Sequence, residues 1–145
     1  LIFYSNKCAI HWNLSDNIKV SNTSKLADAC VCTTTYDYFK MEGADEAYKK
    51  FADKCKMTRG WSDCYCNMLL ITGRIDAVIE PIVRPWDVSA SIPLLLEAGG
   101  SYTDWTGEKN SYPYKAIASN GFIHNELVDL LHPYSSGDFW GLIER

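Results

Sequence analysis

The sequence predicts a single domain with an α/β fold, and three observations support this. Short β-branched or apolar stretches, typical of strands, alternate with stretches whose apolar residues recur three and four positions apart, as on helices. The 145 residues, 47% of them hydrophobic and 22% charged, suit one domain with a buried core. No internal repeat or low-complexity segment interrupts this alternation.

The first 21 residues predict only short strands, around 1–4, 8–12 and 18–20, separated by a turn-rich stretch. The chain opens directly in this pattern, without Met and without the charged start of a signal peptide. We therefore expect it to be part of a longer polypeptide.

The middle of the chain predicts two strands and two helices. Residues 30–35 are rich in β-branched side chains and predict a buried strand. Residues 43–58 carry apolar side chains on one helical face and charged ones on the other, which predicts an amphipathic helix. Asp63 can cap a further helix that Gly73 closes, and residues 74–80 alternate as a strand does.

Residues 80–100 predict a strand end, a turn and a helix that starts at Asp87. Asp is a favourable first residue because its carboxylate accepts hydrogen bonds from the free N–H groups of the first turn. Apolar residues then follow on one helical face, and Gly99 and Gly100 close the helix. Pro93 is predicted to lie inside it, where it would remove one hydrogen bond and bend the axis.

The last third of the chain predicts short strands at 102–104 and 115–119 and a helix that Pro133 ends. The tail at 134–145 is rich in aromatic residues, which are unfavourable when exposed. We therefore expect the tail to dock on this chain or on a partner, a second copy in a homodimer included.

Charge and cysteine content limit the partners and the compartment. A formal net charge of −4 without a Lys/Arg run argues against nucleic-acid binding, and no apolar run is long enough to span a membrane.

The cysteines are expected to be reduced and mostly packed in the core, which favours a cytoplasmic protein. Disulfides, or zinc held by the two Cys-x-Cys pairs, are the alternatives. The six cysteines are Cys8, Cys30, Cys32, Cys55, Cys64 and Cys66.

A run of motif residues lies around the predicted helix: Trp86-Asp87, a small-residue turn, an apolar stretch, Glu97-Ala98-Gly99-Gly100, and then Tyr102-Thr103-Asp104-Trp105-Thr106-Gly107. This run resembles the second signature of the inositol monophosphatase superfamily, a group of metal-dependent phosphomonoesterases. The resemblance implies a layered α/β/α domain in which Asp87 is a catalytic metal ligand. It also implies that the cofactor is Mg²⁺, which prefers oxygen ligands.

The resemblance runs from about residue 1 to 133 and covers only the family's C-terminal half. It implies remnant edge strands of an N-terminal domain and a linker at 1–24, the C-terminal α/β domain at 25–133, and the aromatic tail at 134–145. In the family, a Glu on a helix and an Asp-Pro-(Ile/Leu)-Asp-Gly-Thr segment of the first half supply the other metal ligands, and that segment is absent here. We expect the missing N-terminal half to be the partner that completes the site, and the chain alone to bind Mg²⁺ weakly and not turn over.

A second resemblance concerns the substrate. Residues 59–65, Arg-Gly-Trp-Ser-Asp-Cys-Tyr, look more like the histidinol-phosphatase branch of the family than like its inositol enzymes. An Asp beside a Glu suits a cationic amine better than a neutral polyol. The family positions that build the leaving-group end of the pocket match Trp61, Ser62, Asp63 and Glu80.

Plainer roles stay open for these residues: a helix cap for Asp63, a partner of Arg84 or Arg59 for Glu80, and core packing for Trp61. The predicted function is the C-terminal half of a Mg²⁺-dependent phosphomonoesterase that acts on a small phosphorylated metabolite. Histidinol phosphate is preferred over an inositol or sugar phosphate. The rival hypothesis is a non-catalytic α/β module that binds a partner through its tail.

Overall fold

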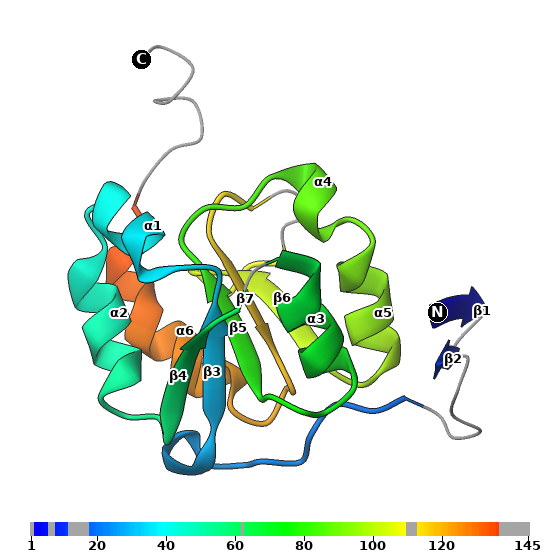
Figure 1. Cartoon of the computed structure of the whole chain (residues 1–145). Coiled ribbons are helices and arrows are strands. Elements are labelled where there is room, and N and C mark those ends of the chain that lie inside the picture. The colour runs from blue at the N-terminus through cyan, green and yellow to red at the C-terminus, as the bar shows by residue number, and fades with distance from the viewer. Residues whose placement is uncertain (1, 6–7, 12–17, 62, 110–112, 137–145) are drawn as a thin grey trace.

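The structure, a computed structural model, describes residues 2–5, 8–11, 18–61, 63–109 and 113–136. It confirms the α/β class, with helices on both faces of a mixed five-stranded sheet (Figure 1). The strands are β1 Ile2–Ser5, β2 Cys8–His11, β3 Cys30–Thr33, β4 Met57–Gly60, β5 Ala77–Glu80, β6 Ser101–Asp104 and β7 Ala116–Ser119. The helices are α1 Tyr36–Met41, α2 Asp45–Ala52, α3 Asp63–Ile71, α4 Pro85–Val88, α5 Ser91–Glu97 and α6 His124–Leu131, with 3-10 turns η1 Leu26–Asp28 and η2 His132–Tyr134.

The sheet order is β4-β3-β5-β7-β6. Strands β4, β3 and β5 run parallel, whereas β7 pairs antiparallel with both β5 and β6. The parallel pairs need crossover connections, which α1, α2 and α3 provide. The first two strands form a separate antiparallel hairpin.

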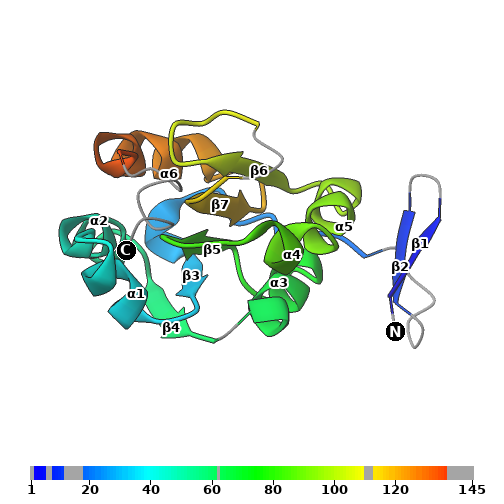
Figure 2. The ribbon, with the colours of Figure 1, turned by 90° about the horizontal axis from the view of Figure 1, so that it is seen from above.

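The two faces of the sheet carry separate hydrophobic clusters, which gives three layers (Figure 2). Strand β5 alternates between them, because Val78 packs toward α3 and α5 while Ala77 and Ile79 pack toward α1, α2 and α6. The predicted α/β/α layering is therefore confirmed.

The segment before β3 is held against the domain by polar contacts. Asn120 Nδ2 donates to Ser21 Oγ at 2.9 Å and to the Thr23 carbonyl at 2.8 Å. Buried Asp76 accepts from Ser21 Oγ at 2.5 Å. Residues 18–20 were predicted as a strand but form none, because Val20 instead donates its N–H to the Ala98 carbonyl in the loop after α5.

The predicted helix over 43–58 is too long. Helix α2 ends at Ala52, and residues 57–60 form β4, whose parallel pairing with β3 overrides the helical pattern. Helix α1 was not predicted. It starts where the Thr35 hydroxyl accepts from the Asp37 N–H at 3.3 Å.

The helix predicted to start at Asp87 is two short helices. Helix α4 begins at Pro85, whose fixed φ suits a first helical position, and Asp87 lies in its first turn. Helix α5 begins at Ser91, so Pro93 occupies a first-turn position where no intrahelical N–H bond is lost. The break between the two helices therefore comes before Pro93, and Pro93 does not lie in the interior of one long helix.

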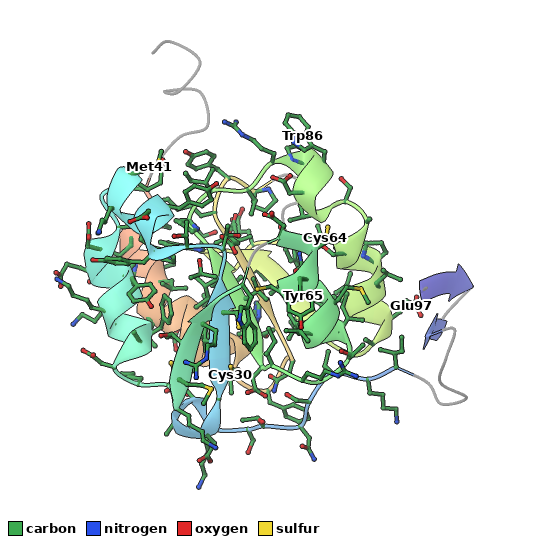
Figure 3. The ribbon with its side chains drawn as sticks, viewed as in Figure 1. Cys30, Met41, Cys64, Tyr65, Trp86 and Glu97 are labelled. Carbon is green, nitrogen blue, oxygen red and sulfur yellow. The ribbon has the colours of Figure 1, made fainter. Side chains whose placement is uncertain are left out.

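The described cysteines are all free thiols, of which Cys32 and Cys66 are buried and Cys64 is exposed. Cys64 and Cys66 are two positions apart on α3 and so point to different sides, which prevents them from chelating one ion. Figure 3 shows Cys30 at the opposite end of the sheet from Cys64. Within the described ranges no cluster of three or more His, Cys, Asp or Glu side chains could hold a metal. The side chain of Cys8 is not among those described.

The chain after α6 is anchored by Lys115. This buried lysine donates from Nζ to the carbonyls of Tyr134 and Ser136, at 2.8 and 2.9 Å, and lies 5.1 Å from the Trp105 ring centre. Residues 137–145, most of the predicted docking tail, lie outside the described residues.

Candidate active site

A cavity of about 300 Å³ opens beyond the carboxyl ends of β3 and β5. This is the edge of an α/β sheet at which loops and helix starts converge, and where ligands bind in such folds. Three of the predicted site residues, Asp63, Glu80 and Asp87, line it. The other lining residues are Thr34, Tyr38, Asn67, Val78, Ile82, Val83, Arg84, Val88, Tyr102, Ala116 and Ala118.

Asp87 is exposed at the cavity and is oriented by its own helix. Its Oδ2 accepts from the Arg84 N–H at 3.0 Å. Arg84 has the extended backbone expected before a proline, which aims that N–H at the first turn of α4. The carboxylate is thus oriented at the cavity through Oδ2.

Glu80 ends β5 at the edge of the cavity. Its Oε1 accepts from the Thr34 N–H at 2.7 Å and from the Thr34 hydroxyl at 2.9 Å. Burial raises the pKa of Glu80 to about 7, the Asp63 charge adds to the rise, and the bonds from Thr34 oppose it. Buried Oε2 has no partner in the described part of the chain. Glu80 therefore has a free acceptor at the cavity.

Asp63 is the first residue of α3 and has a left-handed backbone, with φ of 50°. That conformation is unfavourable for residues with a side chain, although Asp tolerates it better than most, and such strain gathers at functional sites. Its exposed carboxylate adds negative charge beside Glu80. Two carboxyl groups at one cavity favour a cationic ligand group.

Trp61 is not among the cavity-lining residues. Its ring lies 6.3 Å from that of Tyr65 in an edge-to-face arrangement, and its exposed fraction is 38%. Tyr65 and Cys64 lie on α3, and Trp86 projects from the top of α4 (Figure 3). Ser62 lies outside the described residues. The substrate-binding roles predicted for Ser62 and for Trp61 both stay predictions.

Thr34, Asn67 and Tyr102 also line the cavity, and none of them was predicted from the sequence. Thr34 directly follows β3, so its place at the carboxyl edge of a parallel strand was the available signal. Asn67 lies one helical turn after Asp63 and shares its face. Tyr102 gave no such signal, because its position depends on the pairing of β6 with β7.

The donor set fits a divalent cation only in part. Asp87 offers one oriented carboxylate, which is the type of ligand that Mg²⁺ takes. The described residues place no second and third ligand beside it, since no group of three ligating side chains occurs among them. Asp87 is therefore suited to be one ligand of a shared site.

A family comparison agrees with this geometry. Residues 2–136 match the model of the inositol monophosphatase family. The chain belongs to this family. The resemblance that the sequence motifs indicated is thereby confirmed over almost the same range.

Relatives in this family include phosphatases of several kinds. A chloroplastic bifunctional phosphatase of Arabidopsis thaliana is 38% identical over 65% of this chain and 27% of its own length. A histidinol-phosphatase of Streptomyces coelicolor is 29% identical over 79% of this chain and 43% of its own length. The Thermotoga maritima IMPase structure superposes with a TM-score of 0.73 at 26% identity, covering 87% of this chain and 48% of that one.

The chain thus spans less than half the length of these relatives. The family's members are phosphatases that use divalent metals, and histidinol phosphatases are among them. In the part of the chain that the structure describes, no helix is long and apolar enough to cross a membrane.

Proposed function

We propose that this chain forms part of a Mg²⁺-dependent phosphomonoesterase that hydrolyses a small phosphate ester. The observation that carries the proposal is the convergence of Asp63, Glu80 and Asp87 on one cavity at the carboxyl edge of the sheet. Asp87 would hold the cation together with ligands from the family's first half. A bound Mg²⁺ neutralises phosphoryl charge and makes a water nucleophilic near neutral pH.

The chain's own residues would then position the two ends of the substrate. Asp87, oriented by the Arg84 N–H, marks the phosphate end. Glu80 and Asp63 mark the leaving-group end, where their charges and the free Oε2 of Glu80 suit an ammonium group. This favours histidinol phosphate, whose leaving group carries an amine, and with it a role in histidine biosynthesis in the cytoplasm. The alternative is an inositol or sugar phosphate, which the inositol monophosphatases among the relatives support.

The test of this proposal is Asp87→Asn in the polypeptide that also carries the Asp-Pro-(Ile/Leu)-Asp-Gly-Thr ligands. Phosphate release from histidinol phosphate should fall by more than the roughly 10–100-fold that loss of an outer-shell partner of a metal typically costs. Asp37→Asn is the matched control, because that carboxylate is exposed on α1, pairs with Lys40 and is not among the cavity-lining residues. Near-normal hydrolysis by Asp87→Asn, at unchanged circular dichroism, would exclude Asp87 as a ligand.

Substrate preference has its own measurement. The completed protein should show a higher kcat/KM for histidinol phosphate than for inositol 1-phosphate. Glu80→Gln should reduce that ratio by removing the negative charge that favours the amine. A ratio that does not change would assign Glu80 a structural role only.

A further inference from the structure

Tyr102 carries a buried hydroxyl group that has no partner among the described residues. The residue is 8% exposed, and its Oη makes no hydrogen bond to them. Within the described ranges, the buried side-chain polar atoms in this state belong to Thr33, Glu80 and Tyr102. Two of these three residues, Glu80 and Tyr102, line the cavity described above. An unpaired buried hydroxyl is unfavourable, so its occurrence at a cavity points to a ligand that satisfies it.

The sheet register places Tyr102 on the cavity side. Tyr102 pairs with Ala118 of β7, which in turn pairs with Val78 of β5, so these three side chains share one face. Ala116, the neighbour of Glu80 in the register, lies on the same face. The small alanines belong to β7, which lies between β5 and β6, and they leave room beside Tyr102 on this face. Tyr102 also borders a second cavity along the β6 edge, but its side chain packs with the first cavity's residues.

Apolar side chains line the cavity beside Tyr102. Val78, Val88, Ala116 and Ala118 line the cavity within the same core cluster as Tyr102, and their side chains offer no hydrogen bond. A polyol set against these four side chains would leave the hydroxyl groups that face them unsatisfied, and each unsatisfied group is unfavourable. A flat ring with one hydrogen-bond acceptor would bury its faces on the alanines and valines and satisfy Tyr102.

We propose that Tyr102 determines substrate specificity by donating a hydrogen bond to a ring nitrogen of a flat heterocycle in the leaving group. The inference rests on the proposed function, in which that heterocycle is the imidazole of histidinol phosphate. The amine of the same leaving group then lies toward Glu80 and Asp63, which line the same cavity. Burial, with the nearby Asp104 charge, raises the pKa of Tyr102, so its hydroxyl keeps the proton to donate.

The experiment uses the purified 145-residue chain and L-histidinol as the probe. Binding is followed through the backbone amide resonances of Ala116 and Ala118, in the native chain and in Tyr102→Phe. The native chain should show saturable shifts at these amides, and Tyr102→Phe should weaken binding about 5- to 10-fold, as expected for one neutral hydrogen bond. Tyr65→Phe, a change of an exposed tyrosine on α3 that is not among the cavity-lining residues, should leave the affinity unchanged.

Three outcomes would overturn this inference: no shift at Ala116 and Ala118, an equal affinity in Tyr102→Phe, or an equal loss in Tyr65→Phe. Phenylalanine preserves the ring, so the fold should persist, and the amide spectrum of the variant checks this. The outcome is independent of the phosphatase test. Hydrolysis by the completed enzyme with no Tyr102→Phe effect on KM rejects only the Tyr102 role. Histidinol binding to this chain, without hydrolysis of histidinol phosphate by the completed enzyme, rejects only the phosphatase.

Discussion

Glu80 is the residue whose charge the fold perturbs most clearly near neutral pH. Its pKa rises from 4.5 to about 7 on burial. The folded chain therefore binds more protons than the unfolded chain between these values, and stability must fall as pH rises through that window. His124, whose pKa burial lowers to about 4, has the opposite effect between pH 6.5 and 4.

We predict that Glu80→Gln stabilises the chain at pH 8 and changes little at pH 4.5. The gain should be about 1–3 kcal/mol, because glutamine keeps an acceptor for Thr34 without a buried charge. Urea unfolding of both proteins at the two pH values measures it, and comparison at each pH removes the His124 contribution. Equal urea midpoints of the native chain and Glu80→Gln at pH 8 would mean that ionised Glu80 is well solvated and contradict the prediction.

At the scale of elements, the packing of α5 on the sheet depends on Gly100. A Cβ atom there would lie 2.7 Å from the Ser119 carbonyl oxygen and would overlap the Leu95 side chain. The close approach between the end of α5 and β7 is therefore possible only with glycine.

We predict that Gly100→Ala destabilises the chain by about 2–3 kcal/mol, because the overlap forces helix and strand apart. Gly60→Ala is the control, since its Cβ would meet only the Thr34 carbonyl oxygen at 3.6 Å. Thermal unfolding of both variants tests this. A loss for Gly60→Ala as large as that for Gly100→Ala would indicate a general effect of replacing glycine.

The elements that the sequence predicted well are those with a local signal. Helix α3 lies between Asp63 and Gly73 as its cap and stop residues indicated, and β3 follows its β-branched pattern. The errors arose where tertiary contacts decide. Residues 57–60 become a strand only because β3 is available to pair with them, and Pro93 fits a helix because the chain turns before Ser91.

The residues of the candidate site also differ in whether the sequence alone could identify them. Asp63, Glu80 and Asp87 were predicted from motif resemblance, and the structure brings them to one cavity. Tyr102 was missed because it reaches the cavity through strand pairing that no local pattern encodes. Thr34 was missed although its place directly after a predicted strand was a usable signal. Motif residues are thus readable from sequence, whereas the groups that shape the space between them need the fold.

At the scale of the whole molecule, the described carboxylates are too few for a complete divalent-metal site. We predict that the purified 145-residue chain binds Mg²⁺ weakly and releases no phosphate from histidinol phosphate. Calorimetry with MgCl₂ and a phosphate-release assay measure both properties, with Asp87→Asn as the control. Mg²⁺-dependent turnover by this chain alone, abolished in Asp87→Asn, would contradict the prediction.

Strand β5 is the central strand and joins the parallel part of the sheet to the antiparallel part, because it pairs in parallel with β3 and antiparallel with β7. Neither half can separate from the other without losing contacts to this strand. Its amide protons should therefore exchange with solvent only on global unfolding, and more slowly than those of the edge strands β4 and β6. Because Glu80 ends β5, the leaving-group end of the cavity is attached to the strand that should lose its structure only when the whole domain unfolds.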